Sequence, residues 1–130
     1  RNTFMGTSSM IGIYNSEDGT VQASYCHYDG YVDGNGATLL SAYNSQYDAE
    51  IVANGGYLSG LTNDYLESRV NSVHDDKASR YSSIEQYLNM GGNINGAEYL
   101  YLWDGVCWMV ASLYEKVVKF VKVEMILTKA

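Results

Sequence analysis

The chain has 130 residues, of which 46% are hydrophobic and 18% are charged, with two cysteines and no proline. That length fits one domain, and the hydrophobic fraction is ordinary for a globular protein. No apolar run approaches the ~20 residues that cross a bilayer, and no basic region precedes an apolar core at the amino end. Cys26 and Cys107 lack the spacing of a disulfide framework or a zinc site. We therefore expect a cytoplasmic protein with two free, buried thiols and no membrane partner.

The net formal charge is −7, and its distribution along the chain is uneven. Between Asn2 and Glu67 there is no Lys or Arg, whereas four of the five lysines lie in the last fifteen residues. An acidic surface repels phosphate backbones, which argues against direct nucleic-acid binding. Two interpretations stay open: the carboxylates imitate phosphates in the basic groove of a nucleic-acid enzyme, or they only keep the protein dissolved.

The first predicted elements form a β-hairpin. Met10–Tyr14 and Val21–Tyr28 are β-rich runs, and the turn between them, residues 15–20, contains Asp-Gly, one of the strongest short-range hairpin signals. Residues 1–9 are expected to be a flexible lead-in. After the hairpin, Asp-Gly at 29–30 and the glycine-rich run at 33–36 break the chain.

The middle of the chain predicts three short helices: Ala37–Asn44, Asp48–Asn54 and Ser83–Met90. Asp48 is the expected cap of the second helix, and glycine pairs follow the second and third helices. Residues 57–61 and 65–70 stay ambiguous, and the polar run 71–83 predicts an exposed loop.

A second Asp-Gly hairpin is predicted from Tyr99–Trp103 and Val106–Ser112. Beyond it, helical spacing of apolar residues competes with many β-branched side chains, and we expect a helix at Leu113–Val121 and an extended segment at Val123–Leu127. The elements together predict a single α+β domain over residues 1–130, with an antiparallel sheet built from two Asp-Gly hairpins and short helices on one face.

The end of the first hairpin concentrates rings and hydrogen-bonding groups, namely Tyr25, Cys26, His27, Tyr28, Asp29 and Tyr31. Neighbours on a strand point to opposite faces, so Cys26 and His27 cannot easily pair as nucleophile and base. His27 should share a face with Tyr25 and Asp29, and Asp29 could orient the imidazole. Two interpretations stay open: these residues form the rim of a ligand pocket, or His27 is a half-buried histidine with a structural partner.

Two residues from elsewhere complete the candidate ligand-binding set. Arg80 is one of two arginines in the body of the chain that could meet a phosphorylated ligand, and Trp103 could supply a stacking surface. The tyrosine content also favours self-association, so we expect a homo-oligomer.

Other chemistries find weaker support. The cysteines, histidines and acids lack metal-ligand spacing, and the run from Asp29 fails the calcium-loop pattern at Tyr31 and Leu40. The turn Gly34-Asn35-Gly36 could seat an anion, although turn chemistry alone explains it. No catalytic triad or paired-carboxylate pattern stands out, so we expect neither an enzyme nor a cofactor.

The segment GIYNSEDGTVQASYCHYDGY, residues 12–31, resembles the amino-terminal signature of a family of small proteins from tailed bacteriophages. That signature is a strand and an Asp-Gly turn, then Tyr-Cys-His, an aromatic residue and Asp-Gly-Tyr. The resemblance covers residues 11–40 well and YLYLWDG at 99–105 weakly, and it departs at Val32, where the family usually has proline. Small phage proteins of this kind are often accessory factors that blunt host immunity, and this chain is similar to the Thoeris anti-defence sponges, which sequester cyclic nucleotide-like signals. The phosphate-binding arginines of a sponge have no match here.

The resemblance implies a non-enzymatic phage accessory protein in the host cytoplasm, which binds and sequesters a nucleotide-derived signal. The alternative is an acidic inhibitor of a host nucleic-acid enzyme, of the anti-CRISPR or anti-restriction type, that binds its protein target through Asp29, Asp33, Asp48 and Glu50. A virion structural protein is a further alternative.

Overall fold

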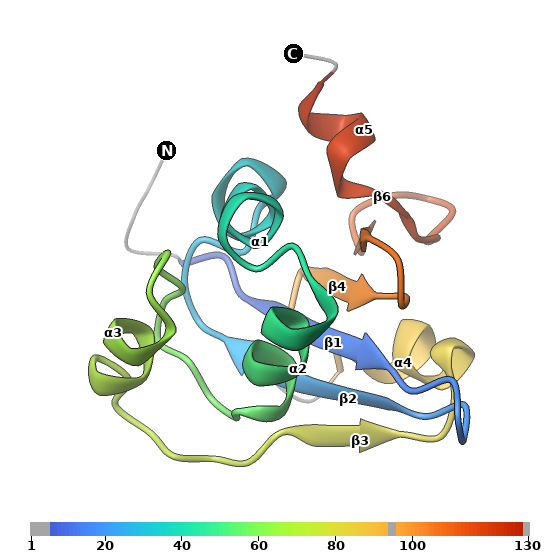
Figure 1. Ribbon diagram of the computed structural model, residues 1–130. Helices are drawn as coiled ribbons and strands as arrows, with labels where there is room; N and C mark the ends of the chain where they lie inside the picture. The colour runs from blue at the N-terminus through green and yellow to red at the C-terminus, as the bar shows by residue number, and fades with distance from the viewer. Residues whose placement is uncertain (1–5, 94–95, 129–130) are drawn as a thin grey trace.

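Two β-hairpins form the centre of the fold, in a computed structural model that describes residues 6–93 and 96–128. The first pairs β1 (Ser9–Tyr14) with β2 (Val21–Cys26), and the second pairs β4 (Tyr99–Trp103) with β5 (Trp108–Ser112). β1 and β4 lie side by side in parallel and join the hairpins into one sheet (Figure 1). Short edge strands, β3 (Ser79–Tyr81) and β6 (Val121–Lys122), complete the order β3-β2-β1-β4-β5-β6. Both predicted hairpins are confirmed.

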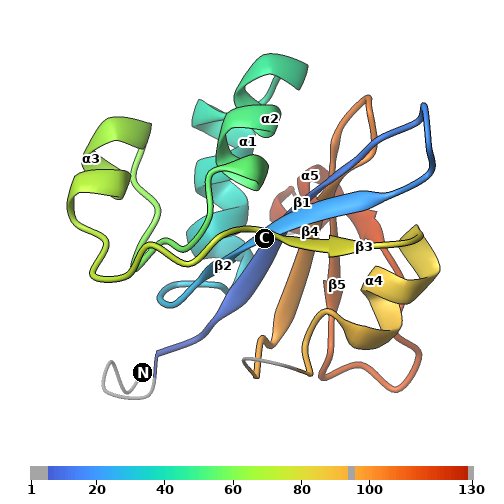
Figure 2. The ribbon, with the colours of Figure 1, turned by 90° about the horizontal axis from the view of Figure 1, so that it is seen from below.

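Side chains alternate along these strands and build a core on each face of the sheet. One face, with Ile11 and Tyr101, is covered by α1 (Ala37–Ala42), α2 (Gln46–Asn54) and α5 (Val123–Leu127). The opposite face, with Met10 and Leu100, is covered by α4 (Ile84–Met90), as Figure 2 shows. The structure is therefore a single α+β domain with a mostly antiparallel sheet, but the expectation that all helices lie on one face is wrong for α4.

A glycine in β1 allows α4 to pack closely. Tyr87 of α4 is fully buried, and its hydroxyl donates a hydrogen bond of 2.7 Å to the Tyr101 carbonyl. A Cβ on Gly12 would lie 3.0 Å from Cζ of Tyr87 and 3.2 Å from that same carbonyl oxygen. The absence of a side chain at Gly12 therefore makes room for the tyrosine ring beside β1.

The loop after β2 is fastened to the sheet by an asparagine. η1, a short π-helical turn at Val32–Gly36, runs directly into α1. Within it, Asn35 is 1% exposed, and its side-chain amide donates to Ser9 Oγ at 3.1 Å and to the Tyr28 carbonyl at 3.2 Å. Tyr101 adds a bond of 2.6 Å from its hydroxyl to the Gly30 carbonyl. The glycine- and asparagine-rich run thus fixes the residues that follow β2 against the start of β1.

Several local predictions are wrong, each for a physical reason. Ser45, not Asp48, caps α2, because its Oγ accepts the Asp48 N–H at 3.1 Å. The expected loop 71–83 contains β3, whose pairing comes from β2 and not from its own polar sequence. Residues 1–5 of the expected lead-in lie outside the described residues, while Ser8 is buried and Ser9 begins β1.

The carboxy-terminal prediction is reversed. Residues 113–120 form turns and loops, because Leu113, Val118 and Phe120 pack against the α4 side of the sheet instead of lining a helix. Residues 123–127 form α5 because Val123 and Leu127, one helical turn apart, both pack on the opposite core.

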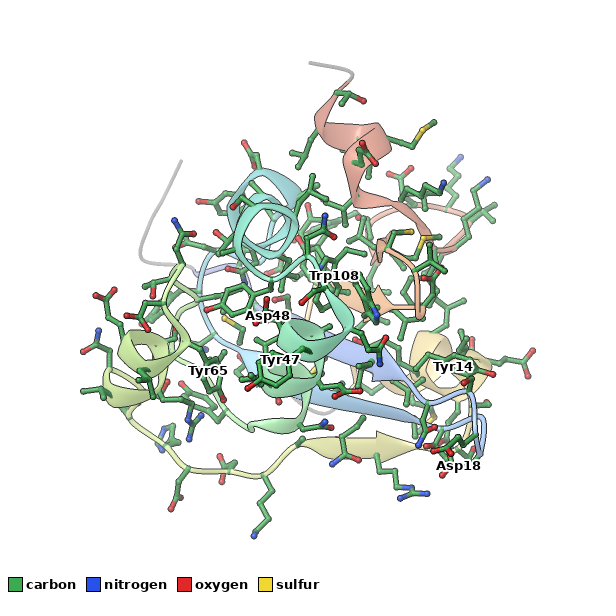
Figure 3. All side chains as sticks on the ribbon, in the orientation of Figure 1. Tyr14, Asp18, Tyr47, Asp48, Tyr65 and Trp108 are labelled. Carbon is green, nitrogen blue, oxygen red and sulfur yellow. The ribbon has the colours of Figure 1, made fainter. Side chains whose placement is uncertain are left out.

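The ambiguous residues 65–70 form α3 (Tyr65–Val70), a short helix at the outer edge of the molecule, where Figure 3 labels its first residue, Tyr65. Cys26 is buried as expected, but Cys107 is only partly buried, so that part of the expectation is wrong. Within residues 6–93 and 96–128, no helix combines the length and apolar character that a membrane crossing requires.

Candidate functional site

An open pocket lies where β2 ends, and we call it the aromatic pocket. It has a volume of about 570 Å³ and is lined by Tyr25, His27, Tyr57, Val73, His74, Asp76, Lys77 and Ser79. This volume falls within the range of about 300–1,000 Å³ that is usual for small-molecule sites. Three segments far apart in the sequence contribute to it: the end of β2, the segment after α2, and the loop from α3 into β3.

Backbone pairing brings the second segment against the first. Leu58 N–H donates to the Tyr25 carbonyl at 2.9 Å, and His27 N–H donates to the Leu58 carbonyl at 3.0 Å. Ser24, buried on β2, accepts the Gly56 N–H and donates to the Ala53 carbonyl, which ties the end of α2 to the strand. These backbone hydrogen bonds form a sheet-like ladder, which holds the segment with Tyr57 beside Tyr25 and His27.

The third segment is docked on the second through the backbone as well. Tyr57 N–H donates to the Asp76 carbonyl at 2.8 Å, and a Cβ on Gly56, whose φ is 95°, would lie only 2.5 Å from that carbonyl oxygen. The guanidinium of Arg69, on α3, donates to the Tyr57 carbonyl. The loop that carries His74 and Lys77 is thereby fixed beside Tyr57.

Four rings follow one another along the pocket. The ring centroids of His27 and Tyr25 are 5.9 Å apart, those of Tyr25 and Tyr57 are 5.8 Å apart, and those of Tyr57 and His74 are 5.0 Å apart. Tyr57 is buried, Tyr25 is partly buried and both histidines are exposed. The pocket thus presents tyrosine surface at its base and imidazole edges at its opening, an arrangement suited to a planar ligand.

A hydrogen bond sets the chemistry of His27. The Tyr25 hydroxyl lies 2.9 Å from His27 Nδ1. Burial is the largest cause that raises the pKa of Tyr25, so the hydroxyl stays protonated at neutral pH and can donate to Nδ1. Where the Tyr25 hydroxyl donates this bond, Nδ1 is the acceptor and Nε2 carries the ring hydrogen that a ligand can accept.

The polar groups of the pocket come from the α3–β3 loop. Lys77 and Asp76 are exposed, and Ser79 is partly buried at the start of β3. An ammonium group can meet a phosphate, while carboxylate and hydroxyl oxygens can accept from a ligand. Among the described residues, no group of three His, Cys, Asp or Glu side chains is placed to share a metal ion.

The structure brings only part of the predicted site together. Tyr25 and His27 line the aromatic pocket, and Tyr28, which is 45% exposed, meets the His27 ring edge-on at 4.5 Å. Asp29 has a positive φ of 61° and accepts a 3.0 Å hydrogen bond from the Tyr31 hydroxyl. Tyr28, Asp29 and Tyr31 are therefore not part of the lining of the pocket.

Arg80 and Trp103 lie elsewhere, which corrects the idea of one site. Arg80 pairs with Asp18 at 3.2 Å and lines a different hollow of about 530 Å³, which we call the polar groove. The polar groove lies between the turn of the β1–β2 hairpin, α2 and the β4–β5 turn. Figure 3 labels Tyr14 and Asp18 at the turn of the β1–β2 hairpin. Trp103 is 4% exposed, and its indole N–H donates to Gln46 Oε1 at 2.7 Å, so it belongs to the core.

Sequence reasoning did not place Tyr57, His74, Asp76, Lys77 or Ser79 in the site. Their segments carry no period or motif, and long-range backbone contacts bring them in: the pairing of residues 57–59 with β2, the bond from Tyr57 to Asp76, and the pairing of β3 with β2 at Ser79. The only sequence signal was that the chain has just two histidines, and the structure shows that both line the same pocket.

Comparison of the chain with protein-family models, curated protein sequences and solved structures finds no match.

Proposed function

We propose that this is a non-enzymatic phage accessory protein that counters host antiviral defence by binding and sequestering a nucleotide-derived signal in the aromatic pocket. The observation that supports this most is the convergence of two tyrosines and two histidines beside Lys77 in one pocket. In this proposal the protein acts in the host cytoplasm as a homo-oligomer, as its resemblance and its composition led us to expect.

The pocket offers each part of a nucleotide a suitable partner. Stacking of a base on an aromatic side chain is worth about 1–3 kcal/mol, and the partly buried Tyr25 provides a ring for it, with the buried Tyr57 ring packed beside it at a centroid distance of 5.8 Å. His27, Asp76 and Ser79 offer donors and acceptors for the edge of a base, and Lys77 can meet a phosphate. Capture alone is sufficient for sequestration, so no chemical step is invoked.

Thermal unfolding in the presence of a nucleotide panel tests the proposal. The panel contains cyclic mononucleotides, cyclic dinucleotides and ADP-ribose derivatives. A ligand at 100 times its Kd stabilises the fold by about 2.7 kcal/mol, which corresponds to a rise in Tm of roughly 10 °C for a domain of this size.

Variants assign any rise in Tm to the pocket. His74→Ala and Lys77→Ala change exposed side chains and should reduce the rise. Arg80→Ala is the matched control, because it removes an exposed cation from the polar groove and should leave the rise unchanged. If no member of the panel shifts Tm, or if Arg80→Ala abolishes the shift and Lys77→Ala does not, the proposal fails.

The polar groove favours a second candidate, an acidic inhibitor of a host nucleic-acid enzyme. Its lining includes Glu17, Glu50 and Asp104, and Glu50 is held by a 2.9 Å hydrogen bond from Gln46. Fixed carboxylates can imitate phosphates in a basic protein groove. This candidate predicts binding to a nucleic-acid enzyme that weakens between low and physiological salt, and salt-independent binding would count against it.

A further inference from the structure

We infer that the aromatic pocket is specific for guanine, with the Asp76 carboxylate accepting from the N1 and N2 donors of the base and His27 donating to its opposite edge. Because this names the base of the nucleotide-derived signal, it rests on the proposed function. Three features of the pocket support it: one side chain that only accepts hydrogen bonds, one oriented ring donor, and the spacing between the two.

Asp76 is the one acidic residue among the described residues that line the aromatic pocket. Its backbone is fixed, because its carbonyl accepts the Tyr57 N–H at 2.8 Å. Its side chain is exposed, and no hydrogen bond or ion pair with another described residue uses the carboxylate. An ionised carboxylate accepts hydrogen bonds and donates none. The Asp76 carboxylate is therefore available to two neighbouring donors of a ligand.

Guanine is the common base that offers a carboxylate two neighbouring donors. Its N1–H and its N2 amino group lie side by side, whereas adenine and cytosine place a ring-nitrogen acceptor beside their amino donor. Uracil and thymine place a carbonyl acceptor on each side of their single N–H donor. A carboxylate opposite any of these acceptors would face another lone pair, which leaves both groups unsatisfied. The described lining residues also include no Asn or Gln, the side chains that pair with adenine through two hydrogen bonds.

His27 supplies a complementary donor from β2. The Tyr25 hydroxyl lies 2.9 Å from His27 Nδ1, and with this hydroxyl as the donor the ring hydrogen of His27 is on Nε2. Guanine presents two acceptors, O6 and N7, on the edge next to N1–H, whereas adenine presents an amino donor in place of O6. A carboxylate acceptor and an imidazole donor in one pocket therefore match guanine at both edges.

The spacing of the backbone segments suits a purine. Leu58 pairs with β2 through its bonds to Tyr25 and His27, and the preceding residue, Tyr57, bonds to Asp76 on the other side. Figure 1 shows the chain after α2 passing between the end of β2 and the chain that leads into β3. Two steps of strand-to-strand spacing, at about 4.8 Å each, therefore separate the backbones of His27 and Asp76 by roughly 10 Å. A purine with a hydrogen bond at each end spans such a gap.

Calorimetric titration of the full chain with GMP, IMP, AMP and XMP tests the specificity, because these four nucleotides share the phosphate and differ in the base. Wild type should bind GMP at least tenfold more tightly than IMP, which lacks the N2 amino group, and than AMP, which places an acceptor opposite Asp76. Asp76→Asn should reverse the preference between GMP and XMP, because the new amide can donate to the O2 carbonyl of xanthine and still accept from N1–H. Asp75→Asn is the matched control, because it removes the neighbouring exposed carboxylate, which does not line the pocket, and it should leave the ranking unchanged.

Lys77→Ala separates recognition of the base from binding of the phosphate. It should weaken the binding of all four nucleotides by a similar factor, because Lys77 would meet the phosphate that they share. The guanine assignment is overturned if GMP binds no more tightly than AMP or IMP, or if Asp76→Asn still prefers GMP to XMP. Either result leaves the proposed function standing as long as some member of the wider nucleotide panel raises Tm. Circular dichroism of each variant verifies that it is folded.

Discussion

We expect Asn35 to be the polar side chain that contributes most to the stability of the end of the first hairpin. Its amide donates to Ser9 Oγ and to the Tyr28 carbonyl, with a further contact of 3.4 Å to Cys26 Sγ. Each buried hydrogen bond contributes about 1 kcal/mol net, and an orphaned buried acceptor costs about 1–3 kcal/mol. Asn35→Ala should therefore reduce the free energy of unfolding by about 2–4 kcal/mol.

Asn35→Asp tests the same geometry more sharply, because an aspartate side chain has the shape of asparagine but, when ionised, no hydrogen-bond donor. An ionised carboxylate would be buried against acceptors, so the pKa of the new carboxyl is raised in the folded state relative to the unfolded chain. The folded state then binds more protons than the unfolded state, and stability falls as pH rises from the unfolded pKa to the folded pKa, by up to about 1.4 kcal/mol per pH unit. The variant should be closest to wild type near pH 4 and much less stable at pH 7.5.

Urea unfolding followed by tryptophan fluorescence measures this, since Trp103 and Trp108 are 4% and 1% exposed. Asn63→Asp, which adds the same charge at an exposed position, is the control and should show no such pH dependence. If Asn35→Asp is as stable as wild type at pH 7.5, the amide does not donate as described and the reasoning is refuted.

Two further predictions follow from the packing. Gly12→Ala should lower the free energy of unfolding by about 1–3 kcal/mol, because the new Cβ would crowd the Tyr87 ring and the Tyr101 carbonyl, and an unchanged urea midpoint would contradict that packing. Burial raises the pKa of the Cys26 thiol to about 12, whereas Cys107 is partly exposed, so iodoacetamide at pH 8 should alkylate Cys107 at least roughly tenfold faster in peptide mapping. Equal rates in the folded protein would contradict the burial of Cys26, and urea should remove the difference.

The parts of the fold that could be predicted are those encoded locally. Both Asp-Gly turns specify hairpins because Gly19 and Gly105 adopt positive φ, which glycine does without steric cost. The helix stop at Gly55 was equally readable. The parallel pairing of β1 with β4 could not be predicted, because it joins residues about ninety positions apart and has no local signature.

The same distinction between local and long-range signals applies to the candidate site. Tyr25 and His27 were identified because they are close together in the sequence at the end of the first hairpin, and they do line a pocket. Arg80 was grouped with them on chemical type alone. It is the neighbour of Ser79 on β3, but it lines the polar groove and not the aromatic pocket. Tyr57 and Lys77 reach the pocket only through long-range hydrogen bonds, so no sequence pattern could indicate them.

The most direct test of the aromatic pocket is mass spectrometry of small molecules that co-purify with the protein from phage-infected host cells. Wild-type protein should retain a phosphate-containing, ultraviolet-absorbing compound that the double variant His74→Ala, Lys77→Ala loses and the Arg80→Ala variant keeps. If wild type and the double variant carry the same small molecules, or none, the pocket does not hold a nucleotide-derived signal.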